Sequence, residues 1–86
     1  MYYVYLLVSD TSERYIGYTS DLRKRFQQHN RGVTQSTKGK RGYLAYYEAY
    51  ASKEDAMRRE TRLKDGRAKH HLLRRVSRSL DFLGLK

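Results

Sequence analysis

The stretch Met1–Thr19, MYYVYLLVSDTSERYIGYT, carries the strongest structural signal in the sequence, because it predicts two strands joined by a short turn. Its first part, Met1–Val8, is aromatic, β-branched or otherwise apolar at both parities. Ser9–Glu13 supplies turn-forming residues, and Arg14–Thr19 resumes a strand-like pattern. A strand that is apolar on both faces is typical of the interior of a sheet, so we expect Met1–Val8 to be covered on both sides.

A helix is expected directly after this hairpin. Ser20 is the predicted N-cap, and Asp21 places a negative charge in the first turn. Leu22 and Phe26 lie four residues apart and start an apolar stripe. The helix should end near residues 30–32, where an asparagine and a glycine occur.

The remainder predicts a loop, a third strand and a second helix. Val33–Gly42 contains two glycines and three basic residues, which indicates an exposed loop that is a candidate phosphate-contacting flap. Tyr43–Tyr50 predicts the third strand. Ser52 followed by Asp55 resembles a capping box and opens a helix that runs to about residue 64.

A last helix is expected at about Arg67–Ser79, and its apolar residues share one face: Ala68, Leu72, Val76 and Leu80. The predicted order is strand, strand, helix, strand, helix, helix. This order indicates an α+β fold, and the length of 86 residues indicates a single domain over residues 1–86.

Charge points to a polyanionic partner. The chain has 19 Lys and Arg against 9 Asp and Glu, a formal charge of +10, and a phosphate backbone would relieve the resulting self-repulsion. The alternative is a basic, solvated surface without a specific partner. A membrane role is disfavoured, because the basic residues are spread over several elements and no apolar span occurs. The absence of cysteine agrees with a reducing, cytoplasmic compartment.

Two tyrosines are predicted to share one patch of the sheet. If the turn pairs Val8 with Arg14, Tyr5 faces Gly17 and lies diagonal to Tyr15. Glycine in a strand often marks the close approach of a ligand, so Gly17 is expected to leave open space between the phenols. The alternative is that tyrosine simply suits β-sheets.

Three charged or titratable residues fall beside predicted apolar stripes. Glu60 lies in line with Ala56, Met57 and Leu63, so it should be paired with a cation such as an arginine, hydrogen-bonded, or coordinated to a metal. In the first helix, Arg25 and His29 flank the stripe that Leu22 and Phe26 begin. A lone histidine there is more often a core residue than a catalytic group.

These motifs resemble a known family. The tripeptides YVY (Tyr3–Tyr5) and YIG (Tyr15–Gly17) are similar to the two signature motifs of GIY-YIG nucleases, although Tyr3 stands where the family name has glycine. Arg25, His29 and Glu60 follow in the order and approximate spacing of that family's arginine, histidine and metal-binding glutamate. The resemblance covers residues 2 to about 70 and extends to branched-DNA resolvases and excinuclease C.

The resemblance implies a three-stranded antiparallel sheet flanked by helices and hydrolysis of phosphodiester bonds in repair or recombination. It also implies one divalent ion, Mg²⁺ or Mn²⁺, on Glu60. Tyr5 would accept a proton from the attacking water, helped by nearby cations that lower its pKa, and Arg25 would bind the phosphate oxygens. Tyr15 and His29 would orient the water. Specificity would come from this domain or from a protein partner.

Nucleic acid is the expected partner, with DNA favoured over RNA. The candidate backbone contacts are all basic: Lys38, Lys40, Arg41, Arg62, Lys64, Arg67 and Lys69. Their alternative role is to keep the protein soluble. Besides the endonuclease, two hypotheses stay open at this stage: a non-catalytic nucleic-acid-binding module of the same fold, and an adaptor whose basic surface meets an acidic protein.

Overall fold

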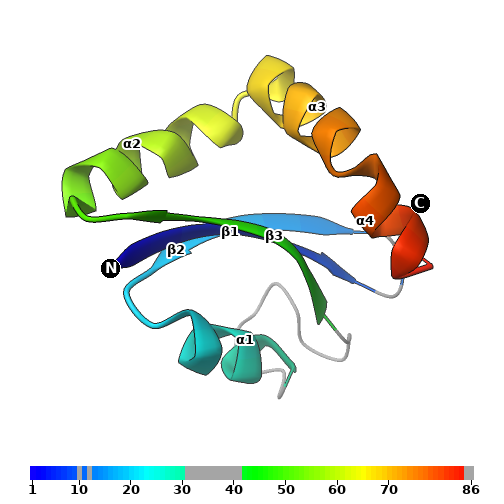
Figure 1. The fold of residues 1–86 in the computed structure, drawn as a ribbon, viewed down its shortest axis with the longest axis horizontal. Helices are drawn as coiled ribbons and strands as arrows, with labels where there is room; N and C mark the ends of the chain where they lie inside the picture. The colour runs from blue at the N-terminus through cyan, green and yellow to red at the C-terminus, as the bar shows by residue number, and fades with distance from the viewer. Residues whose placement is uncertain (10, 12, 31–41, 85–86) are drawn as a thin grey trace.

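A three-stranded antiparallel sheet forms the centre of the molecule (Figure 1). The computed structural model describes residues 1–9, 11, 13–30 and 42–84. β1 (Tyr2–Ser9) lies between β2 (Arg14–Thr19) and β3 (Gly42–Tyr50). The predicted α+β class and the interior position of the first strand are therefore confirmed.

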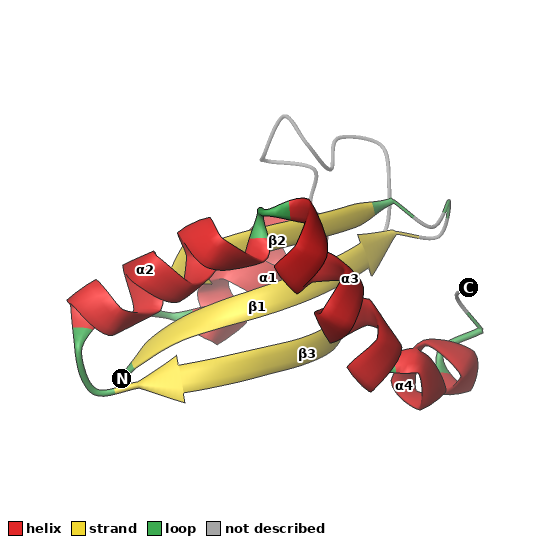
Figure 2. Cartoon of the chain, turned by 90° about the horizontal axis from the view of Figure 1, so that it is seen from above, coloured by secondary structure: helices red, strands yellow, loops and turns green. Residues whose placement is uncertain are grey.

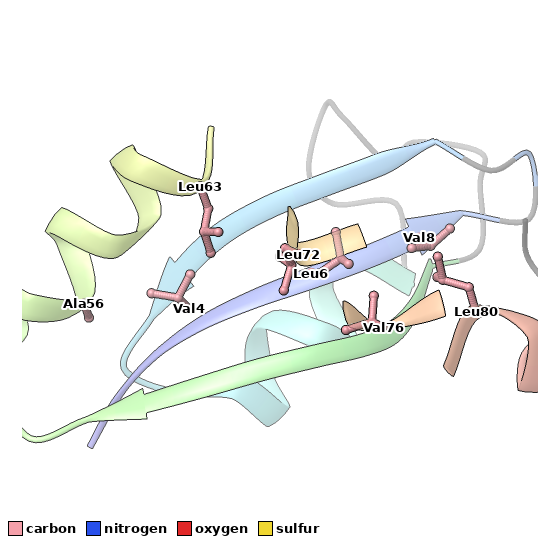
Figure 3. Close-up of a cluster of buried hydrophobic side chains, with 8 residues drawn as sticks. All are labelled: Val4, Leu6, Val8, Ala56, Leu63, Leu72, Val76 and Leu80. Atoms are coloured by element: carbon pink, nitrogen blue, oxygen red, sulfur yellow. The ribbon is translucent and has the colours of Figure 1, made fainter. Parts of the chain in front are cut away.

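Helices cover both faces of this sheet (Figure 1). One face carries α2 (Lys53–Leu63), α3 (Gly66–Arg75) and α4 (Ser77–Phe82), and the other carries α1 (Leu22–Asn30). The core lies on the three-helix face and consists of buried side chains from β1 and these helices (Figure 3): Val4, Leu6, Val8, Ala56, Leu63, Leu72, Val76 and Leu80. Among the described residues, no helix is long and apolar enough to cross a membrane.

The predicted strand register is confirmed. Val8 pairs with Arg14, and Tyr5 pairs with Gly17 on β2 and with Tyr47 on β3. The turn between β1 and β2 is held by Ser9, whose hydroxyl oxygen accepts a hydrogen bond of 3.0 Å from the backbone N–H of residue 13. Because side chains alternate along a strand, Tyr5 points to the α1 face while Val4 and Leu6 point to the core.

The start of α1 differs from the prediction. Asp21, not Ser20, acts as the cap, because its Oδ1 accepts a hydrogen bond of 3.1 Å from the backbone N–H of Lys24. Thr19 supports this turn by accepting a hydrogen bond of 3.0 Å from the Asp21 N–H. The predicted cap of α2 is confirmed: the Ser52 hydroxyl accepts from the N–H of Asp55.

The last predicted helix is divided in two. Val76 has φ −100° and ψ 17°, which ends α3 and precedes α4. Leu72, Val76 and Leu80 are all buried against the sheet across this bend. The sequence predicted the same burial from one straight helix over residues 67–79. The predicted loop over 33–42 is also corrected at its end, because Gly42 is the buried first residue of β3. Its other residues lie outside the described part of the chain.

The ring of Tyr5 lies directly against Gly17. A Cβ at position 17 would overlap the Tyr5 hydroxyl oxygen and Cζ, and it would lie 3.1 Å from Cε1. The expectation that Gly17 leaves an open space was therefore wrong: the phenol of Tyr5 fills that space. The missing side chain at residue 17 is what allows the phenol to extend across β1 to the edge strand β2.

A polar network fixes α2 on β3. The Glu48 carboxylate accepts hydrogen bonds from Arg59 Nε at 2.9 and 3.1 Å and from Arg59 Nη2 at 3.0 Å. The hydroxyl groups of Tyr46 and Tyr50 also donate to Glu48. Burial opposes ionisation of Glu48, but the bonds from Arg59 and the two phenols outweigh it, so the pKa of this carboxyl is lowered.

The contact between Tyr5 and Gly17 predicts a specific effect of one methyl group. Gly17→Ala should destabilise the protein by about 1–3 kcal/mol, because the Cβ forces the Tyr5 ring off the edge strand. Urea unfolding measures the change in free energy. The matched control is Gly66→Ala at the start of α3, where a Cβ meets nothing within 4 Å. If both variants unfold at the same urea concentration, the packing described for Tyr5 is wrong.

The Glu48 network predicts a loss of stability at neutral and alkaline pH. Glu48→Gln should reduce the free energy of unfolding by about 2 kcal/mol, since Arg59 loses a charged partner. Burial and the bond to Glu48 raise the pKa of Tyr50 from its ordinary 10.0 to about 12. The unfolded phenol gives up its proton first, so wild-type stability falls between these pH values, and this fall should shrink in the variant.

The control for that substitution is Glu54→Gln, an exposed carboxylate in the first turn of α2. Urea unfolding across the alkaline range compares the three proteins. If the Glu48 and Glu54 variants are equally stable, or if stability falls with alkaline pH as much in the Glu48 variant as in the wild type, the network does not hold α2 on the sheet.

Candidate active site

Tyr5 is the centre of the candidate site. Its side chain is 5% exposed and lies over Gly17 on the edge strand. Burial raises the pKa of Tyr5, the positive charge of Arg25 lowers it, and the negative charge of Glu60 raises it. Both charged side chains are therefore close enough to act electrostatically on the phenol.

Arg25 and Glu60 approach from opposite faces of the sheet. Arg25 belongs to α1 and Glu60 belongs to α2, and these helices lie on opposite faces of the sheet (Figure 1). Because β2 is an edge strand and carries glycine at position 17, no side chain at that position separates the Tyr5 hydroxyl from the edge. The charges of Arg25 and Glu60 thus both act on the Tyr5 phenol, from helices on opposite faces of the sheet.

The electrostatic balance at Tyr5 differs from the prediction. Nearby cations were expected to lower the pKa of the phenol, and Arg25 does act in that direction. Burial is the larger influence and Glu60 adds to it, so the pKa of Tyr5 is raised. In the protein alone, the phenol is protonated at neutral pH and is a hydrogen-bond donor.

Glu60 lies at the margin of the apolar face of α2. Ala56 and Leu63 on that face are fully buried, whereas Met57, predicted to share it, is 47% exposed. The Glu60 side chain is 25% exposed, and its Oε2 lies 3.4 Å from Nζ of Lys64 one turn later. The partner is thus a lysine rather than an arginine. A pair this exposed contributes little stability, so the carboxylate is available to other cations.

Tyr15 has a partner that the sequence analysis did not single out. Its hydroxyl donates a hydrogen bond of 2.9 Å to Oε2 of Glu13, at the end of the turn that precedes β2. Residues i and i+2 on a strand point to the same side. The position of Glu13, two residues before Tyr15, could therefore have indicated this contact from the sequence. The Tyr15 hydroxyl is oriented by this carboxylate.

Other predicted residues are placed only in part. His29 lies in the last turn of α1, but its side chain is outside what the structure describes, and Lys38, Lys40 and Arg41 lie wholly outside the described residues. The later basic residues are on or next to α2 and α3. Arg62, Lys64 and Arg67 are exposed and Lys69 is partly exposed.

The described residues contain no group of three or more His, Cys, Asp or Glu that could hold a metal ion. A site for Zn²⁺ or Ca²⁺ built wholly from side chains is not present among them. Magnesium has other requirements, because it keeps several waters and commonly takes one or two carboxylates together with substrate phosphate. The accessible carboxylate of Glu60 fits that donor set.

Several known proteins are similar to this chain. A UPF0213 protein from Bacillus pumilus is 40% identical over 65 residues, an alignment that covers 73% of this chain and 66% of the relative, just under two thirds. A UPF0213 protein from Halobacterium salinarum is 38% identical over 66 residues, covering 74% of this chain and 86% of the relative. These names state no activity.

The solution NMR structure of a UPF0213 protein from Bacillus halodurans has a similar fold. It matches with a TM-score of 0.54 and 36% identity, covering 85% of this chain and 83% of that one. The family model for the GIY-YIG catalytic domain matches residues 1–73, which include both tripeptide motifs, α1, α2 and most of α3. The chain therefore belongs to the GIY-YIG catalytic domain family.

Proposed function

We propose that the protein is a metal-dependent endonuclease that hydrolyses phosphodiester bonds of DNA in repair or recombination. The observation that supports this function best is the environment of Tyr5. A buried phenol lies over Gly17 and is subject to the charges of Arg25 and Glu60, which come from helices on opposite faces. Phosphodiester hydrolysis requires a proton acceptor, a phosphate-binding cation and a metal ligand at one place.

Tyr5 is proposed to accept the proton of the attacking water. Its hydroxyl oxygen lies against the edge strand, in the space left by the missing side chain of Gly17. Arg25 is half-buried and favours the ionised phenol by its positive charge. The guanidinium also donates hydrogen bonds to the non-bridging oxygens of the phosphate, where negative charge increases during the reaction.

Glu60 is proposed to hold the metal. A magnesium or manganese ion there would neutralise the carboxylate that raises the pKa of Tyr5 and would stabilise the leaving oxygen. Lys64 would release Glu60 when the site is loaded, since their contact is partly exposed. The Lys64 ammonium would then be free to contact a neighbouring phosphate.

Tyr15 and His29 are proposed to orient the water, and the hydrogen bond that Tyr15 donates to Glu13 keeps the Tyr15 hydroxyl in a fixed direction. The basic residues named from the sequence are proposed to contact the DNA backbone: Lys38, Lys40, Arg41, Arg62, Lys64, Arg67 and Lys69. These contacts carry no sequence information, so a protein partner is one proposed source of specificity.

A non-catalytic nucleic-acid-binding module is the second candidate function. Two observations favour it: the pKa of Tyr5 is raised instead of lowered, and Glu60 is already paired with Lys64. Under this alternative the protein binds nucleic acid equally well with and without metal and leaves the phosphodiester bonds intact.

The endonuclease predicts metal-dependent nicking that requires Glu60. Supercoiled plasmid and branched DNA should be cut in the presence of Mg²⁺ and left intact with a chelator. Glu60→Gln should abolish cutting while DNA binding stays close to that of the wild type, because the variant loses the metal ligand and keeps the basic surface. Gel electrophoresis measures cutting, and fluorescence anisotropy measures binding.

The matched control is Glu54→Gln, which removes an exposed carboxylate from the same helix and should cut like the wild type. Full activity of the Glu60 variant would remove Glu60 from the site. Binding without nicking of any of these substrates would favour the non-catalytic module.

The role of Tyr5 predicts a loss of rate without a loss of structure. Tyr5→Phe should lower the cleavage rate by about 100-fold or more, because general base catalysis is removed and the ring is kept. Single-turnover cleavage measures the rate, and circular dichroism checks the fold. Tyr47→Phe is the control, since this residue pairs with Tyr5 across the sheet and is 53% exposed. Unchanged turnover in the Tyr5 variant would exclude the proton transfer.

A further inference from the structure

A second cationic site lies between α2 and α3, on the sheet face opposite α1. The two helices meet at a bend above the sheet (Figures 1 and 2), and a cavity of about 520 Å³ opens between them. This volume is within the range of about 300–1,000 Å³ that is usual for ligand sites. Ala68 and Leu72 form its apolar part, and its polar lining is wholly basic: Arg59, Arg62, Arg67, His71 and Arg75.

The helical spacing places these basic groups together. Arg67, His71 and Arg75 follow one another at intervals of four on α3, so they form one row beside the buried row of that helix. Arg59 and Arg62 are three residues apart on α2 and face the same cavity. The two consecutive helices thus contribute guanidinium groups to one cavity.

The charge of this cavity is only partly balanced. Glu48 neutralises Arg59, and no acidic residue lines the cavity within the described part of the chain. Asp65 lines a neighbouring hollow with Arg62 and Arg67, and its carboxylate accepts a hydrogen bond of 2.9 Å from the backbone N–H of Arg67. In the cavity and in the neighbouring hollow, the basic side chains thus outnumber the single carboxylate beside them. This excess of positive charge favours binding of an anion.

Arg59 makes one wall of the cavity rigid. Its Nε and Nη2 donate hydrogen bonds to Glu48, and the same side chain lines the cavity. A guanidinium held in this way loses little conformational freedom when it binds a further group. Planar guanidinium groups bind phosphate oxygens with paired hydrogen bonds, so phosphate is the anion that the cavity fits best.

We infer that this cavity, which we call the α2–α3 arginine site, binds a phosphate of the nucleic-acid backbone away from the bond that is cut. Arg59 and Glu60 are consecutive on α2, so their side chains leave the helix about 100° apart. A strand held at the arginine site therefore contacts a different side of α2 from the strand at Glu60. The choice of nucleic acid as the ligand rests on the proposed function.

Metal-free DNA binding tests the inference. The double substitution Arg67→Ala and Arg75→Ala removes two exposed guanidinium groups from the site. It should weaken binding of a labelled duplex about tenfold or more and reduce the slope of log K against log salt by about one, because one phosphate contact is lost. Fluorescence anisotropy over a series of salt concentrations measures both quantities.

The matched control is Arg74→Ala with Arg78→Ala, which removes the same charge from exposed positions outside the cavity. It should bind the duplex within about threefold of the wild type, because contacts count more than net charge. Equal weakening in both double variants would overturn the inference in favour of a general charge effect. Circular dichroism melting should show that both variants are folded.

Binding of inorganic pyrophosphate distinguishes a site for the nucleic-acid backbone from a site for a small phosphate compound. Calorimetry should detect weak pyrophosphate binding to the wild type that disappears in the Arg67 and Arg75 variant. If that variant loses pyrophosphate binding but binds duplex normally, the site takes a small phosphate compound and the backbone assignment is overturned. Cleavage is measured separately: loss of duplex binding in a protein that never cuts would leave this inference standing without the nuclease.

Discussion

The packing of Tyr5 on Gly17 is the constraint on which the site depends. An aromatic ring on the central strand can extend over the edge strand only where the edge strand has no side chain. The antiparallel register places a glycine at that position, directly opposite the tyrosine. The two tripeptide motifs are therefore one structural unit: the first supplies the phenol and the second supplies the space that it occupies.

Two sets of hydrogen bonds position the helices that carry Arg25 and Glu60. Asp21 and Thr19 fix the start of α1, and Arg25 follows one turn later. On the other face, the bond of Arg59 to Glu48 ties α2 to β3 one residue before Glu60. The charges around the phenol thus belong to two rigid helices. Burial and the Glu60 charge outweigh the Arg25 charge, so the pKa of Tyr5 is raised in the protein alone.

Much of the fold was predictable, because it follows from local sequence patterns. The central strand was apolar at both parities, the turn length fixed the register of Tyr5 and Gly17, and Ser52 marked the start of α2. The break at Val76 was not predictable, because the apolar spacing continues through it and the hydrogen bonds around it are kept. Such a bend depends on how the helix meets the sheet, which is a tertiary property.

The residues proposed for the site were singled out from the sequence, but their electrostatics were not. The spacing drew attention to Tyr5, Arg25 and Glu60, whereas the raised pKa of Tyr5 follows from burial, which spacing does not give. The partners of Glu60 and Tyr15 were also missed, since short contacts to Lys64 and Glu13 depend on side-chain conformation. Glu48 was missed although it alternates with Tyr46 and Tyr50 on β3, a pattern that places all three on one face.

A single cation bound by Glu60 should lie beside the Tyr5 phenol. Titration with Mn²⁺, followed by paramagnetic loss of amide signals in ¹H–¹⁵N NMR spectra, locates such an ion. Signals of Glu60, Gly17 and Tyr5 should disappear first, and Glu60→Gln should prevent this loss. Early loss around other carboxylates, with Gly17 and Tyr5 unaffected, would show that no cation binds beside the phenol.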